Sequence, residues 1–299
     1  MGFSWFQKAK GAVFPKLGPI VNAVHLQGMI AARSGPRGMS FASLEQHLER
    51  AFKGMGVHTP DAVALVVNSP GGSPVQSNLI GQKILALQEK HKVPVWSFAE
   101  DVAASGGYWL LAAGQEIYAD RASIVGSIGV VSGGFGLHAF LEQHGVERRL
   151  HTAGKSKARL DPFLAAKAED VAHLKETLGE IHEVFKDHIK ARRGSKIAGH
   201  EDVVFSGDFF TGQKGMELGL VDAIGSLQSV ARDKLGEKVK INYINARPRF
   251  PLLPGLGTAM SYVGGGDGSF SLTARLVDDM VGAVEERMEE RLWRGRVGL

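Results

Sequence analysis

The stretch AVALVVNSPGG, residues 62–72, decides the fold. Residues 62–68 are almost wholly apolar and lack the alternation of a strand with one wet face. Such a run predicts a strand buried on both sides in a parallel sheet. The turn that follows contains Pro70, Gly71 and Gly72. Because α/β proteins bind ligands at the carboxyl ends of their strands, we expect this turn to border a site.

Outward from this stretch, short β-branched runs alternate with longer helical patterns. We expect further strands at residues 93–99, 116–119, 127–131, 146–152 and 239–245. We expect helices at residues 75–91, 104–113, 135–144, 165–193, 211–218 and 227–235. This alternation predicts an α/β fold with a mostly parallel sheet.

Composition excludes several classes of site. The 299 residues include no cysteine, which rules out disulfides, thiolate metal sites and cysteine catalysis. No His-Glu-x-x-His motif or phosphate loop occurs, so we expect neither a metal nor a cofactor. The formal net charge is only +4 and no basic block is interleaved with aromatic residues. Nucleic acid is therefore not an expected partner.

The two ends differ from the middle of the chain. Residues 1–19 form a basic, aromatic N-terminal arm, which either contacts an anionic membrane surface or is simply a flexible or docked arm. Residues 20–246 form the main domain, residues 247–270 a Pro/Gly-rich linker, and residues 271–299 a C-terminal amphipathic helix suited to packing or oligomer contact. No spanning run or secretory signal is evident, so we expect a cytoplasmic or peripherally membrane-associated protein.

Three segments contain groups suited to acyl transfer. In the first, Gly71 and Gly72 can present backbone N–H groups to a bound carbonyl, although the segment also fits a plain strand-to-helix turn. In the second, AASGGYW at 103–109, Ser105 lies near a predicted helix N-terminus and Gly106 offers another N–H donor. Ser105 taken alone fits a helix N-cap better than a nucleophile.

The third segment is GKSKARLDPF, residues 154–163. A lysine deprotonates a serine only when the amine is neutral, and the reference pKa of lysine is about 10.4. Desolvation or neighbouring positive charge must therefore act on a lysine base. Lys157 has Lys155 and Arg159 close by in sequence. A basic surface loop is the alternative interpretation.

Together the three segments resemble the signal peptide peptidase A family, whose members include SohB-like proteases. SIVGSIGV at 123–130 and TGQKGMELGLVD at 211–222 resemble the same family, so the resemblance covers roughly residues 20–246. Two features depart from the family pattern. Ser156 stands where many relatives have tyrosine, and the signal anchor of most bacterial relatives is not seen.

The resemblance implies a ClpP/crotonase-like fold of repeated ββα units and a serine endopeptidase with a Ser–Lys dyad. It implies that Ser105 is the nucleophile and Lys157 the base. Lys157 is preferred to Lys155 because it lies four residues before the Asp-Pro-Phe of the family pattern. The implied oxyanion donors are the backbones of Gly71, Gly72 and Gly106.

The resemblance also implies substrates and partners. The substrates would be small hydrophobic or membrane-derived peptides, and the protein would form a homo-oligomer whose sites are shared between subunits. Two other functions stay open. A crotonase-type acyl-CoA enzyme would use the same fold with a Glu or Asp base, and an inactive scaffold would use the fold without catalysis.

Overall fold

The computed structural model describes residues 18–32, 38–53 and 59–244. The predicted linker, residues 247–270, and the predicted C-terminal amphipathic helix, residues 271–299, lie outside these ranges. The predicted N-terminal arm also lies outside them, apart from residues 18 and 19.

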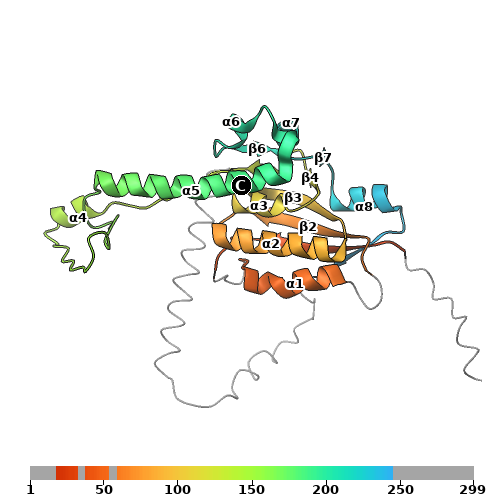
Figure 1. The fold of residues 1–299 in the computed structure, drawn as a ribbon, viewed down its shortest axis with the longest axis horizontal. Helices are drawn as coiled ribbons and strands as arrows, with labels where there is room; N and C mark the ends of the chain where they lie inside the picture. The colour runs from red at the N-terminus through yellow and green to blue at the C-terminus, as the bar shows by residue number, and fades with distance from the viewer. Residues whose placement is uncertain (1–17, 33–37, 54–58, 245–299) are drawn as a thin grey trace, which may run out of the picture.

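The described residues form one eight-stranded, mostly parallel sheet (Figure 1). The main path runs β6–β5–β3–β2–β1–β8, and β4 and β7 branch from β3. The strands are β1 (Ile20–Gln27), β2 (Ala62–Ser69), β3 (Val95–Ala104), β4 (Glu116–Ala119), β5 (Ile124–Gly126), β6 (Phe209–Thr211), β7 (Ala223–Ile224) and β8 (Lys240–Tyr243). Only the β5–β6 pair is antiparallel among these strands.

Helices cover both faces of the sheet. The larger apolar core packs α1 (Phe41–Lys53), α2 (Pro74–His91), α3 (Gly106–Leu111) and the end of α5 (Ala168–Arg193) against one face. The smaller core packs α8 (Leu227–Leu235) against the other face, beside Trp96, Phe98 and Tyr118. The remaining short helices are α4 (His138–Gln143), η2 (Gly194–Ile197), α6 (Glu201–Val204) and α7 (Gly212–Glu217). All but one of the residues of β2 are buried, as its continuous apolar run predicts.

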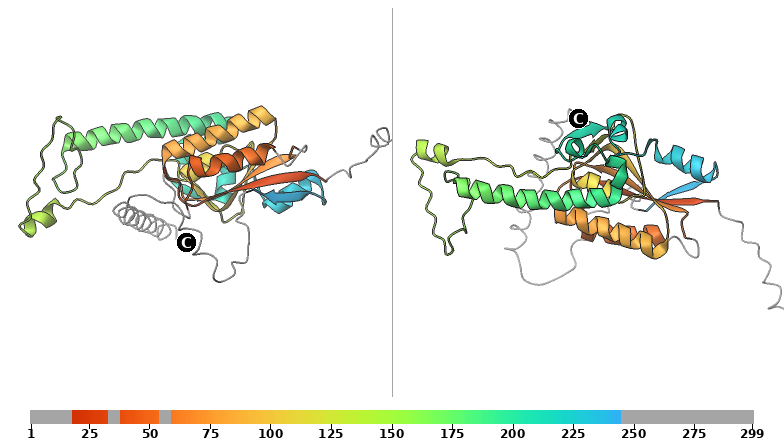
Figure 2. Two further views of the ribbon diagram at one scale, coloured as in Figure 1. Left: turned by 90° about the horizontal axis from the view of Figure 1, so that it is seen from below. Right: turned by 45° about the horizontal axis from the view of Figure 1, so that its top comes forward.

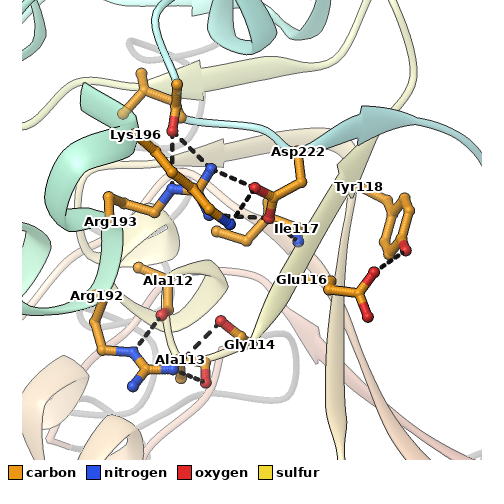
Figure 3. A network of polar contacts seen from close by, with 12 residues as sticks. Ala112, Ala113, Gly114, Glu116, Ile117, Tyr118, Arg192, Arg193, Lys196 and Asp222 are labelled. Atoms are coloured by element: carbon orange, nitrogen blue, oxygen red, sulfur yellow. Dashed lines mark hydrogen bonds and ion pairs between the residues drawn. The ribbon is translucent and has the colours of Figure 1, made fainter. Parts of the chain in front are cut away.

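The C-terminal end of α5 is fixed to the sheet by buried arginine contacts (Figure 3). Arg193 is almost fully buried, and its guanidinium donates to both carboxylate oxygens of Asp222 and to the Gly219 carbonyl. Burial disfavours ionisation of Asp222, but the hydrogen bonds from Arg193 and Lys196 outweigh burial and lower the pKa of that carboxyl. Arg192 donates to carbonyls just beyond α3.

The N-terminal half of α5 extends away from the sheet. In all three views the segment that contains α4 lies at this distal end of the helix (Figures 1 and 2). We call residues 131–167 the projection. Most of its residues are exposed, and it includes α4 and the loop that leads into α5.

The structure confirms the predicted α/β fold with its mostly parallel sheet, an architecture in keeping with a ClpP/crotonase-like fold. Two predicted strands are wrong. Residues 127–131 and 146–152 adopt no strand, and β5 lies at Ile124–Gly126 instead. Most of these residues are exposed, and residues 146–152 belong to the projection, where the described part of the chain supplies no neighbouring strand for pairing.

The Arg193–Asp222 contact predicts a large loss of stability in Arg193→Ala. The substitution leaves a half-buried carboxylate and a carbonyl with fewer partners, which costs about 3 kcal/mol of unfolding free energy. Lys190→Ala on the same helix is the control, because Lys190 and Glu201 form a half-exposed ion pair expected to contribute less than about 1 kcal/mol. Urea unfolding of both variants measures the difference, and equal losses would contradict the assignment.

Candidate active site

Parallel pairing of β2 with β3 places two turns next to each other. Val67 pairs with Ala99, whereas Ser69 pairs with Ala103, so β3 accommodates two more residues than β2 at this point. After this irregularity both strands end at the same edge of the sheet. The glycine turn follows β2, and the Ser105 turn follows β3.

The two turns meet through their backbones. A Cβ atom built on Gly71 would lie 2.7 Å from the Gly106 nitrogen, and one built on Gly106 would lie 3.3 Å from the Gly72 nitrogen. Only glycine permits the approach at Gly71, where φ is also +106°. The structure therefore brings Ser105, Gly71, Gly72 and Gly106 close together.

Ser105 occupies a strained turn between β3 and α3. Its backbone angles are φ 52° and ψ −123°, a region that residues other than glycine rarely adopt. Its N–H donates to the Gly126 carbonyl at 2.8 Å, which fixes the turn against β5. Although Ser105 stands at the N-cap position of α3, its side chain makes no capping hydrogen bond. The residue is partly exposed, so its uncapped hydroxyl is available for chemistry.

Two backbone amides beside Ser105 lack acceptors. Within the described residues, neither the Gly72 N–H nor the Gly106 N–H donates a hydrogen bond. Gly106 begins α3, where the first N–H groups have no partner inside the helix. The Gly71 N–H is different, because it donates to the Ser69 hydroxyl at 3.1 Å. The arrangement can hold an oxyanion between the Gly72 and Gly106 amides.

Lys157 lies in the projection, on an exposed turn close to the start of α5. The Asp-Pro-Phe segment anchors this turn. Asp161 accepts hydrogen bonds from the Phe163 N–H and from Arg148, and these contacts lower the pKa of its carboxyl. Arg159 pairs with Asp170 on the first turn of α5.

One chain does not bring Lys157 to Ser105. Helix α5 contacts α3 through Phe185, whose ring lies 4.9 Å from that of Trp109. The helix runs from Ala168 to Phe185 before this contact, which corresponds to roughly 25 Å. A cavity of about 240 Å³ within the projection is lined by Lys155 and Ser156, and no residue of the Ser105 turn borders it.

Other candidate groups are accounted for by structural contacts. Asp101, four residues before Ser105, accepts a hydrogen bond from the Asn68 amide at 2.8 Å.

Over the described ranges, no group of three or more histidine, aspartate or glutamate side chains is arranged to hold a metal ion. Within the same ranges, every helix is too short or too polar to cross a membrane.

Sequence patterns did not reveal two participants in the glycine turn. Ile30 lies beyond β1, and its backbone N–H and C=O pair with the Gly71 carbonyl and the Ser73 N–H. No signal marks this role, because it uses backbone groups alone. Ser69 belongs to the quoted NSPGG motif, but only the structure shows that its hydroxyl accepts from Gly71.

Comparisons with known proteins place these residues in context. The model of peptidase family S49 matches residues 87–242, just over half of the chain, and this range includes Ser105 and Lys157. Two matching proteins, each named Na(+)/H(+) antiporter NhaA, come from Brucella abortus and Brucella melitensis. Each is 46% identical over 252 residues, which cover 83% of this chain and 33% of that protein.

A third relative is the chloroplastic serine protease SPPA of Arabidopsis thaliana. It is 30% identical over 210 residues, which cover 67% of this chain and 30% of that protein. The chain thus spans about a third of the length of each of these three relatives.

The strained backbone of Ser105 predicts opposite effects of glycine at two serines. Ser105→Gly should unfold at a higher temperature than Ser105→Ala, by the equivalent of about 1 kcal/mol, because glycine adopts positive φ without strain. At Ser97, inside β3, glycine should instead be the less stable of the same two substitutions. Thermal unfolding of the four variants checks this, and a less stable glycine at both positions would refute the strain.

Proposed function

Because the chain belongs to peptidase family S49, we propose that it is a serine peptidase in which Ser105 attacks the peptide bond and Lys157 of the partner subunit is the general base. The observation that carries this proposal is the uncapped Ser105 hydroxyl beside the free Gly72 and Gly106 amides. A nucleophile and an oxyanion hole are the two parts of acyl transfer that one chain already assembles.

The reaction follows from these groups. The neutral amine of Lys157 accepts the Ser105 hydroxyl proton while Oγ bonds to the scissile carbon and the carbonyl electron pair moves onto oxygen. The Gly72 and Gly106 amides bind that oxyanion. Collapse of the intermediate breaks the C–N bond, and the leaving amine takes the proton from Lys157. Water, deprotonated by the same lysine, then hydrolyses the acyl-enzyme and restores Ser105.

The projection supports the involvement of a second copy of the chain. Nine of the fifteen large apolar side chains exposed among the described residues lie on it. They are Val131, Phe135, Leu137, Phe140, Val146, Leu150, Leu160, Phe163 and Leu164. So many exposed large apolar side chains on one segment are typical of a surface that contacts a partner. Docking of this surface on a partner subunit would bury the Lys157 turn, and burial favours the neutral amine that a base requires.

The substrate class rests on the family resemblance, which suggests small hydrophobic or membrane-derived peptides. Peripheral membrane contact through the basic N-terminal arm stays a prediction, as does a cytoplasmic location. The antiporter name belongs to the Brucella proteins, whose chains are about three times the length of the matching segment.

The dyad predicts that Ser105→Ala and Lys157→Ala each lower peptide hydrolysis at least about 1,000-fold, because nucleophile and base act as one unit. Lys155→Ala is the matched control, since this lysine lies on the same exposed turn and should keep most activity. Cleavage of a small hydrophobic fluorogenic peptide by the full chain measures all three variants.

Full activity in either dyad variant would contradict the assignment. Turnover of a CoA ester that survives Ser105→Ala would favour the crotonase-type enzyme. A wild-type chain that binds peptides but cleaves none would favour the scaffold.

Shared sites predict that two inactive variants restore each other. Consider a ring in which each site combines the serine of one subunit with the lysine of the next. In a random equal mixture of Ser105→Ala and Lys157→Ala subunits, about a quarter of these sites have both an intact serine and an intact lysine. Co-refolded mixtures should therefore recover roughly that fraction of wild-type hydrolysis. Mixing either variant with the Ser105→Ala/Lys157→Ala double variant is the control and should recover none. No recovery in the first mixture would mean that each site is contained in one chain.

A further inference from the structure

The hydroxyl of Ser69 forms two hydrogen bonds at the end of β2. Ser69 is fully buried, and its Oγ donates to the Gly28 carbonyl at 2.7 Å and accepts from the Gly71 N–H at 3.1 Å. Gly28 directly follows β1, so this one hydroxyl connects the end of the neighbouring strand to the glycine turn. A buried hydroxyl whose proton and lone pair are both engaged has a fixed orientation.

Gly71 is held on both sides as a consequence. Its N–H is bound by Ser69, and its carbonyl accepts from the Ile30 N–H at 2.8 Å. The peptide bond between Gly71 and Gly72 is trans, so the Gly72 N–H points away from the side that the Gly71 carbonyl faces. Because the carbonyl is directed at Ile30, the Gly72 N–H is directed away from Ile30. Gly71 itself is buried, whereas Gly72 is exposed.

Ser69 also supports the second turn. A Cβ atom built on Gly107 would lie 2.4 Å from the Ser69 carbonyl oxygen and 3.2 Å from the Ser69 Cβ. The first turn of α3 therefore rests directly on Ser69, one residue beyond the Gly106 amide. A single buried residue thus contacts both segments that supply the free N–H groups.

We propose that Ser69 is a positioning residue of the oxyanion hole, holding Gly71 through its N–H so that the Gly72 N–H of the next peptide faces the bound carbonyl oxygen. This inference rests on the proposed peptidase function. Ser69 does not touch substrate, and it acts through Gly71. Without its hydroxyl the buried Gly71 N–H loses its acceptor, and rotation of the Pro70–Gly71 peptide toward another acceptor changes the backbone angles of Gly71. That change turns the following Gly71–Gly72 peptide, and with it the Gly72 N–H, out of the site.

The test compares Ser69→Ala with Ser123→Ala in the full chain. Ser123 is a matched control because its buried hydroxyl also contacts a carbonyl and an amide, those of Ala99 and Asp120. Both variants should lose similar thermal stability. Ser69→Ala should lower kcat roughly 10- to 100-fold with little change in KM, since full loss of one oxyanion donor costs about 100- to 1,000-fold. Ser123→Ala should keep kcat within about twofold of the wild type.

A peptide aldehyde supplies a second measurement. Its adduct with Ser105 carries an oxyanion, so Ser69→Ala should weaken aldehyde inhibition by about the same factor as kcat, while a substrate-like competitor binds as before. Ser69→Cys, which keeps a weak donor and acceptor, should give an intermediate kcat and takes the place of the alanine variant if that variant does not fold.

The outcomes separate the two proposals. Wild-type protein that cleaves no peptide would overturn the proposed function itself. Active wild type with an unchanged kcat in both Ser69 variants would overturn the positioning role alone. Equal losses of kcat in Ser69→Ala and Ser123→Ala would also overturn it, because a general loss of stability would then explain both.

Discussion

The parallel pairing of β2 with β3 is the constraint on which the rest of the site depends. Because of this pairing, both strands end at the same edge of the sheet. The glycine turn after β2 and the Ser105 turn after β3 then lie in contact, with no side chain between them. The Gly71 position lies within van der Waals contact of the Gly106 nitrogen, which a Cβ atom would prevent. The register irregularity between Ala99 and Ala103 lets β3 reach beyond β2 before it turns. The strained backbone of Ser105 is fixed by the same contacts, since Gly126 on β5 holds its N–H.

Local chemistry in the sequence was sufficient to predict much of this arrangement. The continuous apolar run at 62–68 predicted a strand buried on both faces, and its glycine turn predicted backbone donors at the strand end. Ser105 was harder to interpret, because a serine before a helix is most often a cap. The structure shows that its hydroxyl caps nothing. Sequence patterns could not reveal that Ser69 occupies the Gly71 amide, because that depends on tertiary contacts between side chain and backbone.

The wrong strand predictions have a physical cause. Residues 146–152 carry the β-branched and apolar side chains typical of a strand, yet they belong to an exposed segment at the far end of α5. A strand forms only where another strand supplies hydrogen-bond partners. The apolar side chains of residues 146–152 are therefore suited to burial, but the described part of one chain leaves them exposed. Phe135 and Phe140 in the same projection are also largely exposed.

The length of α5 has a consequence for when the proposed peptidase would become active. On the proposed dyad, a newly made subunit holds its nucleophile at the edge of the sheet and its base in the projection at the far end of α5. Such a subunit is latent without a propeptide or an inhibitor. With shared sites, hydrolysis would begin only when copies meet, so its onset would follow the law of mass action and rise with local concentration. Dilution would lower the hydrolytic activity per subunit, and a high local concentration of subunits would raise it.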